Sequence, residues 1–164
     1  MRVFLLSGML WFGCLMQTPP AFADTPPLTG PVLLTVVLPN GTEDQWDLAR
    51  LRALPGHAFT TTTIWTKAPQ TFQGVRLPEF LNELGVNGNA SMTLVAANGY
   101  QVSIETGTRS SDDALIAYQR NGAAMTLRDK GPLWLVYNYD ADPILRSEVI
   151  YANSIWQLDR VEIE

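Results

Sequence analysis

Chemically reactive side chains are scarce in this chain, and their scarcity limits the active sites it could build. His57 is the only histidine and Cys14 the only cysteine, so a centre of several histidines or thiolates is excluded by count. A serine hydrolase triad would need His57 as its base, and no G-x-S-x-G, P-loop or G-x-G-x-x-G motif is present. His57, beside Pro55-Gly56, is more typical of a solvated loop. Asp112-Asp113 could be an acid–base carboxylate pair, but after Ser110-Ser111 they are more typical of a turn or helix cap.

Aromatic and cationic residues between positions 65 and 156 offer a different chemistry, the binding of a flat or anionic ligand. The residues concerned are Trp65, Trp134, Tyr137, Tyr139, Tyr151 and Trp156, in segments that also carry Arg128, Lys130 and Arg146. The same rings could instead fill the core, because tryptophan and tyrosine bury large areas in small β domains. Residue type alone leaves both interpretations open.

The first residues have the composition of a secretory signal peptide. Arg2 precedes an almost unbroken apolar run over residues 3–16, and Ala21-Phe22-Ala23 is a small-x-small cleavage site. Cleavage after residue 23 would export the protein, to the periplasm or beyond, and would remove Cys14, leaving no thiol in residues 24–164. The run is short for a membrane span and no second one follows, so an anchored or lipid-modified form is the weaker alternative, and no span is expected after cleavage.

Composition and charge exclude several classes of protein. The chain has 164 residues, of which 46% are hydrophobic and 16% charged, as in a globular protein rather than a disordered or collagen-like one. The formal charge of −5 argues against a nucleic-acid partner, because phosphate binding needs a basic surface.

The remaining pattern predicts a single strand-rich α+β domain, residues 32–164, behind a flexible proline-containing lead-in at 24–31. Asn-Gly pairs at 40–41, 98–99 and 121–122 separate β-type runs and indicate hairpins. The expected strands are 32–38, 58–65, 91–97, 100–105, 115–118, 125–127, 133–137 and 155–163. The expected helices are 48–54, capped by Asp47, and 78–84, ended by Gly85. A polar loop is expected over 140–146.

A series of short motifs runs through this domain. They are Trp65-Thr66, Phe72-Gln73-Gly74-Val75, Ala97-Asn98 with Tyr100, Asn121-Gly122, the run from Arg128 to Trp134, Tyr137, and Ser154-Ile155-Trp156-Gln157-Leu158. Each is weakly specific alone, but the ordered set over residues 48–164 resembles the small exported members of the molybdopterin-dependent oxidoreductases. The resemblance implies an α+β fold, a strand-rich single domain of the sulfite oxidase molybdopterin-binding type with few short helices.

The resemblance also implies a cofactor site from which this chain departs. In the catalytic branch of the family a cysteine thiolate ligates molybdenum and cationic side chains hold the pterin phosphate. A soft thiolate is not readily replaced by another side chain, and the equivalent region here, residues 59–65, offers threonines. Gly99 stands where small relatives usually carry an acid, Asn138 where they tend to have proline, and Ala152-Asn153 where an arginine is expected.

Three functions therefore remain open. We favour a non-catalytic periplasmic binding module for a small anion, a pterin-like molecule or a protein partner, without a bound cofactor. Its expected ligand-binding residues are Trp65, Asn98, Tyr100, Arg128, Lys130, Tyr137, Arg146 and Trp156. The alternatives are an oxidoreductase that holds molybdopterin without a protein thiolate, and an accessory subunit that docks on a membrane-associated sensor or enzyme.

Overall fold

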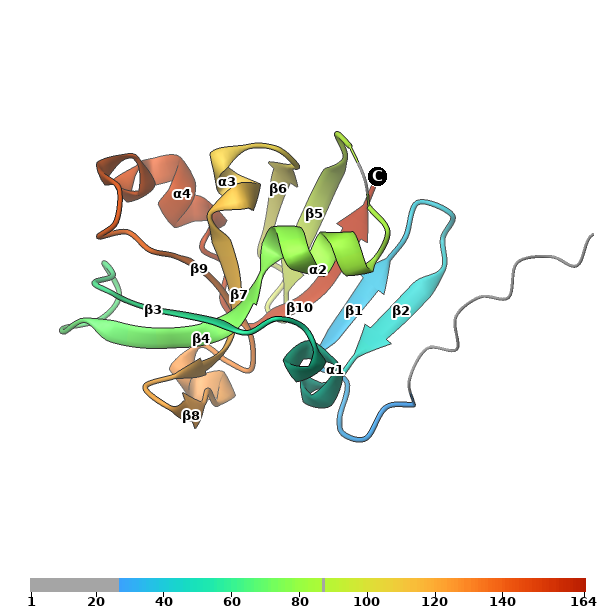
Figure 1. Cartoon of the computed structure of the whole chain (residues 1–164), viewed down its shortest axis with the longest axis horizontal. Helices are drawn as coiled ribbons and strands as arrows, with labels where there is room; N and C mark the ends of the chain where they lie inside the picture. Colours follow the sequence, from blue (N-terminus) through green and yellow to red (C-terminus); the bar gives the residue numbers. More distant parts are fainter. Residues whose placement is uncertain (1–26, 87) are drawn as a thin grey trace, which may run out of the picture.

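The computed structural model describes residues 27–86 and 88–164, which form two sheets with short helices around them (Figure 1). The expected signal peptide, 1–23, lies outside the described residues. The strands are β1 (Leu34–Val37), β2 (Glu43–Trp46), β3 (His57–Thr61), β4 (Gln70–Arg76), β5 (Ser91–Ala96), β6 (Gln101–Glu105), β7 (Ala114–Arg120), β8 (Ala123–Ala124), β9 (Trp134–Tyr137) and β10 (Leu158–Ile163). The helices are α1 (Leu48–Ala53), α2 (Leu77–Glu83), α3 (Arg109–Asp112) and α4 (Glu148–Asn153), with 3-10 turns η1 (Leu127–Asp129) and η2 (Pro143–Arg146). Within this part of the chain, no helix has the length and apolarity to cross a bilayer.

The two sheets are built from different parts of the sequence. The first has the order β2-β1-β10-β5-β6, and its only parallel pair joins β1 to the last strand, β10. The second has the order β3-β4-β7-β8, and β9 also pairs with β7. Figure 1 shows β1 and β2 at one end of the molecule and the long β3–β4 hairpin reaching toward the other. The fold is therefore the strand-rich α+β type expected from the sequence.

Alternation of apolar residues explains how the sheets share a core. In β5, Met92, Leu94 and Ala96 are buried while the residues between them are partly exposed, as in a strand with one covered face. Strand β9 is buried along its whole length, as its continuous apolar run predicts. Phe80 of α2 meets Trp46 edge to face at 4.9 Å, so the helix is fixed by aromatic packing.

Three expected elements differ from the structure by more than two residues at one end or are absent, each because of a tertiary contact or a local turn. The strand expected over 58–65 ends at Thr61, because the next residue, Thr62, donates its backbone N–H to the Asp140 carboxylate at 2.6 Å. The strand expected over 125–127 is wrong: β8 has only two residues, and the chain then enters η1. The strand expected over 155–163 begins only at Leu158, because Gln157 has a φ of 54°.

Asp47 joins the lead-in to the first helix and gives the fold a pH-dependent contact. Its carboxylate accepts from the backbone N–H of Arg50 at 2.8 Å, as a helix cap, and from those of Thr29 at 2.7 Å and Gly30 at 2.9 Å. These hydrogen bonds, that of Arg50 first, lower the pKa of Asp47 from its usual 3.8 to about 2.

Acid should weaken this contact in a defined pH window. Since the folded-state pKa lies below the unfolded one, the stabilisation is complete above about pH 4 and is lost as pH falls toward about 2. We expect Asp47→Asn to lower the melting temperature at neutral pH and to reduce the fall in melting temperature between pH 4 and 2. Parallel pH titrations of thermal unfolding for both proteins check this, and equal acid slopes would contradict it.

Candidate functional site

A pocket of about 310 Å³ opens where the β5–β6 turn, α4 and the segment after α4 meet the loop over residues 62–69. It is lined by Trp65, Ala96, Asn98, Tyr100, Tyr151, Ala152, Ser154, Ile155 and Trp156. Its volume is at the lower end of the range typical of small-molecule sites. The described side chains that line it are aromatic, aliphatic or neutral polar.

Trp65 is the centre of the aromatic wall. Its ring meets Trp156 at a centroid distance of 5.8 Å and Tyr151 at 5.9 Å, both edge to face. Trp134 packs against it from the core side at 5.8 Å. Edge-to-face pairs contribute about 0.5–1.5 kcal/mol each beyond the area they bury, so the rings hold one another in place.

The loop that carries Trp65 is held by Asp140, far away in the sequence. The Asp140 carboxylate accepts from the Thr62 hydroxyl at 2.7 Å as well as from its backbone N–H, and it also binds Arg146 at 2.7 Å. The Thr62 donors, and after them Arg146, lower the pKa of the Asp140 carboxyl. Arg146 therefore supports the loop behind the pocket and does not line it.

The Trp156 wall is held by the residue that follows it. The Gln157 N–H donates to the Lys130 carbonyl at 3.1 Å, its side-chain amide donates to the Leu127 carbonyl at 2.8 Å, and its carbonyl accepts from Ala97 at 2.9 Å. Three segments thus meet at one turn. Both Gln157 and Lys130 have positive φ, at 54° and 71°. Residues other than glycine rarely adopt this backbone conformation, and it is enriched at functional sites.

Lys130 packs against the outside of this wall. Its ammonium lies 3.7 Å from the centroid of the Trp156 ring and 5.6 Å from that of Trp134. Burial of the ammonium, and secondarily the charge of Arg120, lowers the pKa of Lys130. Lys130 does not line the pocket, but it places a positive charge on one of its walls.

Hydrogen bonding leaves the pocket rich in free donors. The Tyr100 hydroxyl donates to the Ala152 carbonyl at 3.0 Å and the Asn98 side-chain oxygen accepts from the Tyr100 N–H at 3.0 Å, so both groups are used. Among the described residues, the Asn98 amide NH₂, the indole N–H groups of Trp65 and Trp156 and the Tyr151 hydroxyl have no hydrogen-bond partner. An occupant with several acceptor atoms would complement them.

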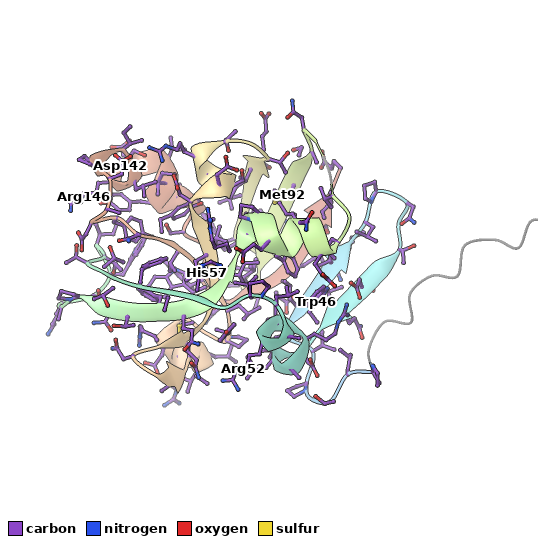
Figure 2. All side chains as sticks on the ribbon, viewed as in Figure 1. Trp46, Arg52, His57, Met92, Asp142 and Arg146 are labelled. Carbon is purple, nitrogen blue, oxygen red and sulfur yellow. The ribbon has the colours of Figure 1, made fainter. Side chains whose placement is uncertain are left out.

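The structure brings four of the eight expected ligand-binding residues to the pocket, namely Trp65, Asn98, Tyr100 and Trp156. Tyr137 lies in the core, where its hydroxyl donates to the Ser110 carbonyl at 2.8 Å and burial raises its pKa. Arg128 is exposed in η1. Figure 2 shows Arg146 beside Asp142, toward the α4 end of the molecule.

Tyr151 and the small residues that line the pocket were absent from the expected set. They belong to α4, over which no element was predicted, and to the segment after it, which was expected to begin a strand at residue 155. The available signal is the run Ser147–Glu148, since Ser147 caps α4 by accepting from the Ile150 N–H at 3.4 Å.

The reactive residues considered in the sequence analysis, His57 and the Asp112-Asp113 pair, make structural contacts away from this pocket. His57 is 2.7 Å from the Glu79 carboxylate of α2, and Asp113 pairs with Arg109 at 2.8 Å. Asp113 caps the end of α3, in agreement with the cap interpretation. Within residues 27–86 and 88–164, no group of three histidine, cysteine, aspartate or glutamate residues is placed to hold a metal ion.

This chain is similar to known proteins in both sequence and fold. The family model described as oxidoreductase molybdopterin binding domain matches residues 50–139, which include Trp65, Asn98 and Tyr100 but end before Tyr151 and Trp156. The crystal structure of the sulfane dehydrogenase SoxCD from Paracoccus pantotrophus is similar, with a TM-score of 0.58 and 17% identity. The similarity covers 79% of this chain and 37% of that one, so this chain spans little more than a third of the SoxCD chain. No curated protein matches the sequence.

Proposed function

This chain belongs to the oxidoreductase molybdopterin-binding domain family, and on that premise we propose that it is an exported, non-catalytic binding module of the family. Its pocket takes a small, flat, anionic molecule of the pterin class. The observation that supports this function is the combination of an aromatic wall with unused hydrogen-bond donors in one pocket of about 310 Å³. Site chemistry rather than fold is the basis of the proposal, because one fold supports many functions.

A pterin ring suits the aromatic and hydrogen-bonding side chains that line the pocket. The flat ring can pack against the faces or edges of Trp65, Tyr151 and Trp156. Its carbonyl and ring nitrogens accept hydrogen bonds, which the Asn98 amide and the two indole N–H groups can donate. A carboxylate on the ligand would be favoured by the Lys130 ammonium that lies on Trp156.

The donor set does not fit a molybdenum cofactor. Molybdenum in this family is ligated by a soft cysteine thiolate, and the part of the chain that the structure describes contains no cysteine. Cys14 lies outside the described residues, inside the expected signal peptide. We therefore assign the pocket no metal and no redox step.

Metal analysis and ligand binding test the proposal together. We expect the mature protein, purified after export in its own host, to contain no stoichiometric molybdenum and to bind pterin-6-carboxylate with saturable quenching of tryptophan fluorescence. A ligand at one hundred times its Kd should stabilise the folded protein by about 2.7 kcal/mol, seen as a higher melting temperature. Trp156→Ala should abolish the quenching, while Trp46→Phe, which changes an indole packed on α2, should keep it. Stoichiometric molybdenum would overturn the proposal in favour of an oxidoreductase.

A further inference from the structure

The residues that line the pocket differ in exposure, which distinguishes its floor, its walls and its mouth. Those of the floor are each at most 4% exposed and are Ala96, Ser154 and Ile155. Those of the walls are half-buried aromatic residues, namely Trp65, Tyr151 and Trp156. The exposed lining residues form the mouth and are Asn98, Tyr100 and Ala152.

A hydrogen bond joins two of the three mouth residues. Tyr100 follows the turn between β5 and β6, and its hydroxyl donates to the carbonyl of Ala152 in α4 at 3.0 Å. The two residues are 52 positions apart in the sequence, so the bond connects two separate segments that line the pocket. Because the Tyr100 side chain is 48% exposed, it lies over the outer part of the pocket and not in its floor. We call this side chain, with its hydrogen bond to Ala152, the strap.

The backbone that carries the strap is fixed by the turn. The Gly99 N–H donates to the Ala96 carbonyl at 2.9 Å, and the Ala96 N–H donates to the Tyr100 carbonyl at 2.9 Å. The Tyr100 N–H donates to the Asn98 side chain at 3.0 Å. The strap can therefore open by rotation of the Tyr100 side chain while the turn stays in place. Exposed side chains rotate within picoseconds to nanoseconds, so the strap exchanges rapidly between closed and open positions.

A single neutral hydrogen bond holds the strap closed. Ala152 lies in the last turn of α4, where carbonyls lack the backbone donors of the helix interior. The neighbouring Tyr151 carbonyl accepts from the Ser154 N–H at 3.1 Å, whereas the Ala152 carbonyl accepts from the Tyr100 hydroxyl. Water can satisfy both groups when the strap opens, so the net contribution of this bond is modest and the open position is populated.

We propose that Tyr100 controls access to the pocket: the strap opens for a ligand to enter or leave and closes again over the bound ligand. This inference rests on the proposed function, because it concerns entry to the same pocket. The ligand packs on the walls beneath the mouth, so the Tyr100–Ala152 bond is present in both the empty and the filled protein. Loss of the bond should therefore raise the association and dissociation rates by similar factors and leave Kd nearly unchanged. A residue that only formed part of the wall would change the dissociation rate and Kd together.

Stopped-flow tryptophan fluorescence with pterin-6-carboxylate tests the strap. Tyr100→Phe keeps the ring and removes the hydroxyl. We expect both rate constants to rise about two- to tenfold, the factor by which loss of one neutral hydrogen bond changes the open fraction, with Kd within about twofold of the wild type. The matched control is Tyr137→Phe, which removes a hydrogen bond of the same kind, from a tyrosine hydroxyl to the Ser110 carbonyl, in the core. Both rate constants should be unchanged in this control.

The pattern of rates decides the outcome. Unchanged rates in Tyr100→Phe would overturn the proposal, and so would faster dissociation alone, because Tyr100 would then be a static part of the wall. Faster association alone would also overturn it, since the strap would not close over the bound ligand.

Acrylamide quenching of the ligand-free protein separates failure of the strap from failure of the proposed function. The half-buried Trp65 and Trp156 line the pocket, while the other two tryptophans of the described chain are at most 2% exposed and contribute little quenching. We expect stronger quenching in Tyr100→Phe than in the wild type and no change in Tyr137→Phe. If the wild type failed to bind pterin-6-carboxylate, the proposed function would fail, and the quenching would still test the strap. Equal quenching in Tyr100→Phe and the wild type would overturn the strap.

Discussion

Replacing Gly74 with alanine should lower the free energy of unfolding by about 3 kcal/mol or more. A Cβ atom at position 74 would stand 2.0 Å from the Ile116 carbonyl oxygen and 2.7 Å from the Ala117 Cα, far inside van der Waals contact. Both obstacles are backbone atoms of β7, so a side-chain rotation cannot relieve the clash. The two strands would have to separate where their register already shifts, between Gln73 and Gly74.

Urea unfolding followed by tryptophan fluorescence measures this effect. The control is Gly56→Ala, whose added Cβ would lie 3.7 Å from the Tyr118 hydroxyl, an ordinary contact, and should change stability by less than about 0.5 kcal/mol. Similar midpoints for Gly74→Ala and the wild type would show that β4 and β7 can move apart freely. Strand β7 also pairs with β9, which separates it from the candidate site. Similar midpoints would therefore leave the glycine in the Phe72-Gln73-Gly74-Val75 motif without a structural explanation.

Local turn chemistry made much of the fold predictable from the sequence. The Asn-Gly pairs at 98–99 and 121–122 do connect paired strands, and Gly99 and Gly122 have φ values of 84° and 78°. The helix expected at 78–84 is α2, one residue earlier, and Gly85 beyond it has a φ of 72°. In each case the residues that specify the backbone conformation lie within the turn itself, so no distant contact is needed.

Features that depend on distant residues escaped the sequence pattern. Strand β3 stops early because Thr62 binds Asp140, 78 positions later. The parallel pairing of β1 with β10 joins the two ends of the described domain, and no local motif specifies it. Helix α4 is only six residues long, and its propensity is too weak to stand out from the polar loop that precedes it.

The candidate site was predicted only in part, because burial of an aromatic residue also depends on contacts that are distant in the sequence. Trp65 and Trp156 were expected in the pocket and line it, whereas Tyr137 was expected there and is fully buried. All three are aromatic residues in apolar surroundings, so residue type does not separate a pocket wall from a core position. The difference arises from β9, which is covered on both faces, a property of the assembled sheets. Charge was equally ambiguous: Arg146 is paired with Asp140, while Arg128 makes no ion pair with any residue in 27–86 or 88–164.

Replacing Trp65 with alanine should have the largest effect on the pocket, because this ring contacts four other aromatic side chains. It contacts Trp134, Tyr139, Tyr151 and Trp156 at centroid distances between 5.8 and 6.3 Å. We expect a loss of about 3 kcal/mol of stability and loss of pterin-6-carboxylate quenching, since the remaining rings lose the surface that orients them. Trp65→Phe, which keeps a flat ring, should retain most of the stability and part of the binding.

Stability and site geometry can be separated by a second tryptophan. Trp46 is 2% exposed and packs edge to face on Phe80, so Trp46→Ala should destabilise the protein by about 3–5 kcal/mol. It lies next to α1, away from the pocket (Figure 2), and below its melting temperature the Trp46→Ala protein should bind pterin-6-carboxylate with wild-type affinity. If both alanine variants lost binding in proportion to their lost stability, Trp65 would be a core residue that happens to face the pocket. Loss of binding in Trp65→Ala alone would identify the ring as the wall against which the ligand packs.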